Sequence, residues 1–361
     1  MKKFSFKNLN KTTKSNMITY GIVIGAYLIM MLLKGTVGIS NLLNGLLVPL
    51  CVYSIVAVAL NLTVGILGEL SLGHAGFMCI GAFTSAFFSK CMKDVITIVP
   101  LRFFLAILVG AAFAGLFGFL IGIPVLRLKG DYLAIVTLAF GEIIKNIINI
   151  LYVGIDSNGV HVSFTSNLDL GLEPGAEAII KGAQGITGTP KNSTFTWGII
   201  LLIITLVIVL NLVNSRSGRA IMSIRDNVIA AESVGIPVTK FKLMAFSISA
   251  ALAGVAGVLY AHNLATLQAL PKNFGYNMSI MILVYVVLGG IGNIRGSVIA
   301  AVLLTVLPEM LRGLQDYRML IYAVLLIGMM LFNWAPACLE WREKHSFKDF
   351  LQKKVRKGGN E

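Results

Sequence analysis

Eight polar residues lie in or beside long apolar runs, and they are the residues of this chain best placed to carry chemistry. They are Asn61, Thr63, Glu69, Ser71, His74, Asp131, Tyr132 and Glu142. A charged group inside a membrane costs several kcal/mol unless it is paired or hydrated, and such groups often mark substrate pathways. We therefore take these eight residues as candidates for lining a pathway.

Each charged candidate also has a structural interpretation. Lys145 follows Glu142 by three residues, so the two can neutralise each other on one helix face. Glu69 and His74 fit a capped helix junction near the membrane surface equally well. Asp131 fits an N-cap or first-turn position better than a pathway position. For Glu142, Glu69 and His74 both interpretations stay open.

Other kinds of reactive site are not indicated by the sequence. The four cysteines show no C-x-x-C spacing and the four histidines are scattered, so no metal or redox centre is expected. A Walker A pattern is absent, which predicts that any ATP and Mg²⁺ bind to a partner chain. With no nucleophile and base in a recognisable pattern, we expect no catalytic residues and no directly bound cofactor.

The elements that must position the candidates are membrane-spanning helices. The 361 residues are 57% hydrophobic and only 13% charged, whereas soluble domains carry about 25% charged residues. A span needs roughly 20 apolar residues. About ten runs come close, namely Met17–Leu33, Leu42–Leu62, Leu70–Ser89, Val99–Ile123, Tyr132–Tyr152, Thr196–Leu212, Leu243–His262, Met278–Ile291, Ser297–Met310 and Met319–Trp334. The predicted fold is therefore an all-α polytopic membrane protein.

Two glycine-rich regions predict broken or re-entrant segments. One is the junction between the second and third runs, from Gly65 to Gly81. The other is "LGGIGNIRGS", which is flanked by the short eighth and ninth runs, so these are expected to be half-helices folding back from a shared turn. The first run lacks a cleavage site and is expected to be retained.

The distribution of lysine and arginine predicts the orientation. Residues 1–16 hold five lysines and no acid, residues 214–242 hold five basic and two acidic residues, and residues 340–361 hold seven basic and four acidic residues. Basic segments stay in the cytoplasm, so we assign an N-terminal tail (1–16), a cytoplasmic loop (214–242) and a C-terminal tail (336–361). Residues 17–335 form the transmembrane domain, with 153–195 as an external loop. The net charge of +14 then reflects membrane lipid and topology and not nucleic acid.

The cytoplasmic loop contains a charged, amphipathic pattern between two hydrophobic runs. It predicts a helix over Gly218–Val234, with Ser217 as N-cap and with Gly235 and Pro237 ending it. The apolar stripe of this helix consists of Ile221, Ile224, Val228 and Ala231. Charges of both signs on the other face argue against a helix lying on lipid. Packing on the chain's own loops and docking in a partner's groove remain open.

Several segments resemble a known family, and together they run from Asn61 to about Trp334. They are "NLTVGILGELSLGHAGFMCIGAF", "LRLKGDYLAIVTLAFGEIIKNI", "SGRAIMSIRDNVIAAESVGIPVTKFKLMAFSISAALAGVAGVLYAH" and "ILVYVVLGGIGNIRGSVIAAVLL". They are similar to the permeases of branched-chain amino-acid ABC importers, of the LivM type.

The resemblance implies a set of partners and a role for the cytoplasmic loop. In such importers an extracytoplasmic binding protein delivers the amino acid, two permease subunits (this type and a LivH type) form the pathway, and two ABC ATPase subunits drive transport. The loop between spans docks on the ATPase. The positions carried over to this coupling loop are Ser217, Gly218, Arg219, Ile221, Ile224, Arg225, Asp226, Val228, Ala230, Ala231, Glu232 and Gly235. We expect the apolar stripe to fill a groove of the ATPase while the charged residues fix the register.

The expected function is that of a non-enzymatic permease subunit in a bacterial cytoplasmic membrane, importing leucine, isoleucine or valine. Permeases of similar pattern import urea, short amides or other amino acids, and these remain alternatives. A stand-alone carrier driven by an ion gradient, using Glu69, Asp131 and Glu142, is the alternative from a different class.

Overall fold

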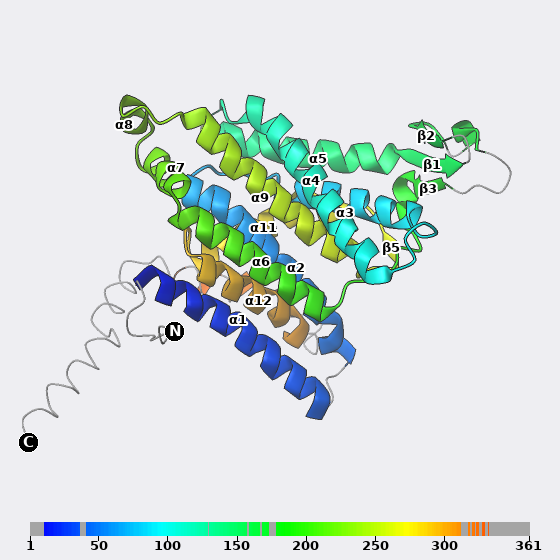
Figure 1. Ribbon diagram of the computed structural model, residues 1–361, viewed down its shortest axis with the longest axis horizontal. Helices are drawn as coiled ribbons and strands as arrows, with labels where there is room; N and C mark the ends of the chain where they lie inside the picture. Colours follow the sequence, from blue (N-terminus) through cyan, green and yellow to red (C-terminus); the bar gives the residue numbers. More distant parts are fainter. Residues whose placement is uncertain are drawn as a thin grey trace, which may run out of the picture. The chain divides into compact units, whose positions relative to one another are not determined.

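The computed structural model describes residues 11–36, 41–128, 130–156, 159–166, 168–172 and 178–311, with isolated positions between 317 and 331 (Figure 1). The chain forms two compact units, one up to Thr305 and one from Val306. All eight candidate residues and the cytoplasmic loop belong to the first unit. Residues 1–10 of the predicted N-terminal tail (1–16), the whole predicted C-terminal tail (336–361) and most of the tenth run lie outside the described residues.

Within the described ranges, six helices are long and apolar enough to cross a membrane, which makes the protein polytopic. They lie in α1 (Lys11–Thr36), α2 (Asn41–Asn61, continued by a π-helix), α4 (Val99–Val125), α5 (Asp131–Ile150), α6 (Phe195–Asn214) and α9 (Val238–Ala261). Their bounds agree with the apolar runs to within a few residues, apart from the longer N-terminal ends of α1 and α9. The agreement is expected because an apolar run in a membrane must satisfy its backbone N–H and C=O groups internally, and a helix does this along the whole run.

The shorter helices include α3 (His74–Cys91), α11 (Tyr276–Gly289) and α12 (Ile294–Met310). As predicted, α11 and α12 are short and meet at a glycine-rich turn, where Gly290 and Gly292 have positive φ angles of 91° and 81°. The two helices touch closely, since a Cβ added at Gly296 would lie 1.7 Å from the carbonyl oxygen of Gly289. Short α10 (Pro271–Phe274) precedes α11.

Small residues hold α3, α4 and α9 together. A Cβ added at Gly118 of α4 would lie 2.4 Å from the Cβ of Ala250, and one added at Gly257 of α9 would lie 2.0 Å from the carbonyl oxygen of Met78. In lipid no hydrophobic force drives helices together, so their association depends on van der Waals contact between closely approaching backbones. Small residues recur every four positions on both helices, and they serve packing within this chain: Ala114, Gly118 and Gly122 on α4, and Ser249, Ala253, Gly257 and Ala261 on α9.

The chain is mostly helical, but not entirely so as the all-α expectation had it. The segment predicted as a loop contains β1 (Tyr152–Asp156), β2 (Gly159–Ser163) and β3 (Ala178–Lys181), antiparallel in the order β2-β1-β3. A second pair joins β4 (Ile186–Thr187) to β5 (Thr266–Leu267). Strands this short are built from few alternating residues, which is why the pattern was too weak to predict them.

Candidate functional site

The end of α2 is a buried π-helix, Leu62–Leu67, which opens the region where most pathway candidates lie. All six of its residues are buried. Gly68 ends it with a left-handed φ of 82°, and the carbonyl of Thr63 accepts hydrogen bonds from the N–H groups of Gly68 and Glu69. Residues 68–73 are not helical, as predicted for this junction. Single π-turns inside helices are frequent at functional sites.

Asn61 ties this end of α2 to the turn between α11 and α12. Its Nδ2 donates to Ser297 Oγ at 2.7 Å, and its Oδ1 accepts from the N–H of Gly292 at 2.9 Å. The side chain is fully buried. The contact also requires glycine at position 65, since a Cβ there would lie 1.9 Å from Asn61 Oδ1. Asn61 therefore holds two broken segments against each other.

Two further candidates bind α9. Glu69 forms an ion pair with Lys242, with 14% and 9% of the two side chains exposed. His74 Nε2 lies 2.7 Å from Ser249 Oγ, which itself donates to the carbonyl of Ala59. Burial of a charge is tolerated when an opposite charge neutralises it. Neither contact is the helix cap expected from the sequence, since the N-cap of α3 is Gly73, with no side-chain cap hydrogen bond; both contacts instead hold the junction against α9.

Thr63 and Ser71 complete the junction between α2 and α3. Both are fully buried, and Thr63 Oγ1 has no hydrogen-bond partner among the described residues. Ser71 Oγ accepts a long hydrogen bond of 3.5 Å from the N–H of Gly73. The neighbouring N–H of Leu72 donates to Thr137 Oγ1 of α5 at 2.9 Å. We call the residues Asn61, Thr63, Glu69, Ser71 and His74 the polar junction.

The carboxylate of Glu142, on α5, has two partners. It pairs with Lys145 on the same helix, as the structural interpretation predicted. Its Oε1 also accepts the N–H of Tyr276 at 2.7 Å, at the first residue of α11. A carboxylate at a helix N-terminus is favoured by the helix dipole. Glu142 thus connects α5 to the start of the short helix α11.

Asp131 and Tyr132 lie apart from the polar junction, at the exposed start of α5. Asp131 occupies the first turn and Gly130 is the N-cap, so the first-turn prediction is confirmed. Tyr132 is 74% exposed.

The cytoplasmic loop forms two helices where one was predicted. These are α7 (Arg216–Asp226) and α8 (Val228–Ser233), separated by Asn227 in an extended conformation with φ −159° and ψ 109°. Asn227 caps α8 by accepting the N–H of Ala230 at 3.1 Å. The N-cap of α7 is Ser215 and not Ser217, since Ser215 Oγ accepts the N–H of Gly218 at 3.1 Å. An asparagine inside a helical pattern competes with the helix by capping the next one.

The apolar stripe of this loop packs on the chain itself. Ile221, Ile224 and Ala231 are buried, and α7 contacts α6, α9 and the π-helix. The expectation that Ile221 and Ile224 fill a partner's groove therefore needs correction, because their surfaces are already covered. Two other apolar side chains face outward instead, with Ile229 79% and Val234 75% exposed. Gly235 ends α8 at φ 82°, as predicted.

The charged residues Arg219, Arg225 and Glu232 are all exposed, Arg225 with 39% of its side chain accessible. Arg225 nevertheless reaches the π-helix, where its Nη1 donates to the carbonyl of Gly65 at 3.0 Å, while its Nε and Nη2 bind Asp226 Oδ1 at 3.1 and 2.9 Å. The loop is thus joined directly to the end of α2 that carries the polar junction.

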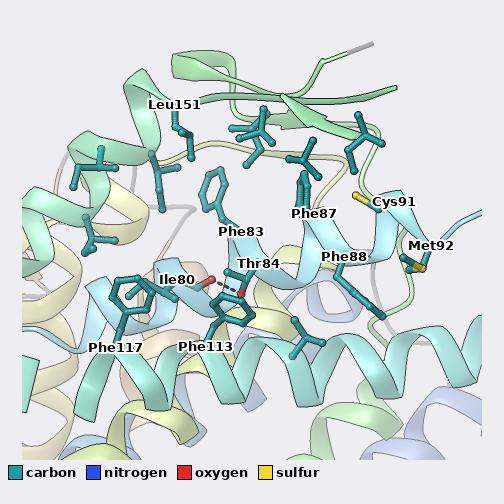
Figure 2. A pocket seen from close by; sticks show the side chains of 18 residues that line it. Ile80, Phe83, Thr84, Phe87, Phe88, Cys91, Met92, Phe113, Phe117 and Leu151 are labelled. Atoms are coloured by element: carbon teal, nitrogen blue, oxygen red, sulfur yellow. Dashed lines mark hydrogen bonds between the residues drawn. The ribbon is translucent and has the colours of Figure 1, made fainter. Parts of the chain in front are cut away.

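A cavity of about 780 Å³ lies between α3, α4, α5 and the sheet β2-β1-β3 (Figure 2). Figure 2 shows Phe83 and Phe87 of α3 and Phe113 and Phe117 of α4 among its lining residues. Its one lining hydroxyl, that of Thr84, donates to the carbonyl of Ile80 at 2.7 Å. An amino acid carries an ammonium and a carboxylate that need polar partners when desolvated. This cavity is therefore unsuited to a zwitterion.

His262 follows α9 beyond its span and is fully buried. Its Nδ1 donates to the carbonyl of Val258 at 3.0 Å, and the ring of Phe103 lies 5.1 Å away between centroids. Burial lowers the pKa of His262 to about 4, and the charge of Arg102 acts in the same direction. His262 is therefore neutral at physiological pH.

Comparison with known proteins decides the family. The family model described as "Branched-chain amino acid transport system / permease component" matches residues 41–332. The chain belongs to this permease family. The permease is 34% identical over 316 residues to the "High-affinity branched-chain amino acid transport system permease protein LivM" of Escherichia coli (strain K12), covering 85% of this chain and 70% of that protein.

Two further relatives differ in name and in similarity. The protein of the same name in Salmonella typhimurium (strain LT2) is 36% identical over 295 residues, or 79% of this permease and 67% of the relative. The "Autoinducer 2 import system permease protein LsrC" of Yersinia enterocolitica is 26% identical over 190 residues, covering 47% of the permease and 51% of the relative. No solved structure was found to match the permease.

Several partners of the polar junction were not predicted from the sequence of the permease. They are Thr137, Lys242, Ser249, Gly292 and Ser297. Ser249 and Gly292 had a signal, because both begin stripes of small residues spaced four apart. Lys242 had no such signal, since it lies just before the apolar run Leu243–His262.

Proposed function

We propose that this chain is the membrane-spanning permease subunit of an ATP-driven importer that translocates leucine, isoleucine or valine. The observation that carries the proposal is the identity of 34–36% to two proteins named as high-affinity branched-chain amino acid permeases, over most of this chain. The family match over residues 41–332 supports the same function.

The proposed complex contains a second permease of the LivH type, two ABC ATPase subunits and an extracytoplasmic amino-acid-binding protein. ATP and Mg²⁺ bind to the ATPase chains, and this chain is not an enzyme. Five exposed residues of the cytoplasmic loop form the proposed contact with an ATPase. They are Arg219, Asp226, Glu232 and the apolar residues Ile229 and Val234.

The proposed topology has ten spans, with both termini in the cytoplasm of a bacterium and the protein in its cytoplasmic membrane. The six long helices are supplemented by α3, which has 18 residues, by α11 and α12, which have 14 and 17, and by the run Met319–Trp334. Of these, α12 reaches the lower end of the roughly 17–25 residues that a span needs, whereas α11 is shorter; the two helices meet at their glycine-rich turn.

The proposed polar part of the substrate pathway is the polar junction. Its buried hydroxyl and amide groups can bind the ammonium and carboxylate of an amino acid, which the apolar cavity cannot. Within it we assign Glu69 a structural role because Lys242 neutralises it. Among the described residues of the junction, Thr63 Oγ1 and His74 Nδ1 are buried without a hydrogen-bond partner. Glu142 and Asp131 are assigned to helix termini.

A second candidate function is import of a different solute by the same type of complex. It is favoured by the similarity to the autoinducer 2 permease of Yersinia over 190 residues. Urea and short amides belong to the same alternative. An ion-coupled carrier remains the alternative from another class.

One reconstitution separates these functions. The chain is co-expressed with the permease, ATPases and binding protein encoded beside it, and uptake of labelled leucine, urea and other solutes is measured in proteoliposomes. The proposal expects leucine uptake that needs internal ATP and the binding protein. Uptake that persists without ATP and disappears with an ionophore would establish the carrier instead. ATP-driven uptake of another solute alone would establish the second candidate.

A further inference from the structure

The helix α7 is fixed to the membrane-embedded part of the chain. Ile221 and Ile224 are fully buried beneath it. Gly218 lies so close to the end of α6 that an added Cβ would be 2.2 Å from the carbonyl oxygen of Leu212. Because protein interiors are close-packed, a displacement of α7 also displaces the elements it packs against. Part of what lies beneath it is the π-helix, and in Figure 1 α7 stands beside the end of α2.

Arg225 makes the directional part of this contact. Its Nη1 donates to the Gly65 carbonyl at 3.0 Å, and Asp226 Oδ1 holds the other side of the guanidinium. The stem of Arg225 crosses Gly68, where an added Cβ would be 2.5 Å from the Arg225 Cγ. A guanidinium presents several donors in one rigid plane, so it can bind a carboxylate and a carbonyl at once. Lysine lacks that geometry.

The same Gly65 peptide faces the turn between α11 and α12. A Cβ added at Gly292 would lie 3.4 Å from the Gly65 carbonyl oxygen, and one added at Gly65 would lie 2.3 Å from the Gly292 nitrogen. Asn61 adds its two hydrogen bonds to Gly292 and Ser297. A displacement of the Gly65 peptide therefore cannot occur without moving this turn.

We propose that Arg225 is a positioning residue that transmits movement of α7 and α8 to the Gly65 peptide of the π-helix, and from there through Asn61 and Gly292 to the α11–α12 turn. The proposal rests on the proposed function, since movement of the loop must come from the ATPase. It assigns Arg225 an internal task, in place of the pairing with an ATPase expected from the sequence. The outward surface of α8 then receives the movement, and α7 passes it on.

The test uses the complete transporter in proteoliposomes and compares Arg225→Met with Arg216→Met. Arg216 is the matched control because it is an exposed arginine on the same helix. Three quantities are measured: association of the ATPase subunits, leucine taken up per ATP hydrolysed, and amide hydrogen exchange at residues 289–294 with and without trapped ATP. Exchange reports whether the turn responds to nucleotide. If Arg225 had a purely structural role, this response would be the same in Arg225→Met as in the wild type.

For Arg225→Met we expect normal association of the ATPases, at least about a tenfold fall in leucine per ATP, which one charge-assisted hydrogen bond is strong enough to produce, and loss of the ATP-dependent exchange difference at 289–294. Arg216→Met is expected to stay within about twofold of wild type on the ATPase and uptake measures. Wild-type coupling and exchange in Arg225→Met would overturn the proposal. Loss of ATPase association would overturn it too, by making Arg225 a docking residue.

If Arg225→Met does not insert, Arg225→Lys decides by the same criteria, because it keeps the charge but cannot hold both partners. Failure of the proposed function gives a different result, in which the wild-type complex takes up no leucine with ATP.

Discussion

Replacing Gly65 by alanine tests the contact between the π-helix and the α11–α12 turn. The added Cβ would lie 1.9 Å from Asn61 Oδ1 and 2.3 Å from the Gly292 nitrogen, where 3.4 Å is the beginning of ordinary contact. Both neighbours belong to packed, hydrogen-bonded groups, so neither yields easily.

The cost has two parts. Overpacking a well-packed interior costs about 1–3 kcal/mol, and losing the hydrogen bond from Gly292 to Asn61 adds about 1–2 kcal/mol. The sum is about 2–5 kcal/mol. At about 2 °C per kcal/mol for a chain of this size, Gly65→Ala should lower the apparent melting temperature by about 4–10 °C.

The assay is thermal unfolding in detergent, followed by fluorescence-detected size-exclusion chromatography. Gly45→Ala is the matched control, because Gly45 lies on the same helix, α2, and an added Cβ there meets nothing within 4 Å. Alanine is the better helix former, so this control should melt at or slightly above the wild-type temperature. Equal melting of the two variants would refute the close packing of Gly65 against the turn.

Three other predictions test the remaining contacts. Lys242→Met leaves Glu69 buried and uncompensated and should cost about 3–5 kcal/mol, whereas the exchanged pair Glu69→Lys with Lys242→Glu should recover much of it; no recovery in thermal unfolding would contradict the ion pair. Ser215→Ala should cost about 1 kcal/mol through the lost N-cap and Ser217→Ala less than half of that; the reverse order in melting would restore Ser217 as the cap. Burial holds the pKa of His262 near 4 in the folded chain, below about 6.5 for an unfolded histidine, so the unfolded state takes up the proton first as the pH falls. The free energy of unfolding should therefore be constant above pH 6.5 and decrease between pH 6.5 and 4. Melting temperatures measured across that range should depend less on pH in His262→Gln.

The spans could be predicted from the sequence because membrane insertion acts on local composition. Val99–Ile123 and Thr196–Leu212 match α4 and α6 closely, since a continuous apolar run has little other way to satisfy its backbone. The pairing of Glu142 with Lys145 was equally accessible, because the two residues are three positions apart on one helix.

The contacts of the site could not be predicted because they join residues far apart in the chain. Arg225 and Gly65 are 160 positions apart, and Asn61 and Ser297 are 236 positions apart. The amphipathic pattern of α7 showed that Ile221 would be buried but not by which surface. The break at Asn227 was missed because its neighbours continue a helical pattern, and only the cap geometry reveals it.

The central claim, that this chain is the permease of an ATP-driven branched-chain amino acid importer, is tested most directly by leucine uptake in proteoliposomes containing the complete complex. Uptake is measured with loaded binding protein outside and with ATP, or no nucleotide, inside. We predict that leucine uptake occurs only with ATP inside, that isoleucine and valine compete with it, and that an ionophore has no effect on it. Uptake that is independent of ATP, or an ATP-driven complex that ignores all three amino acids, would contradict the account.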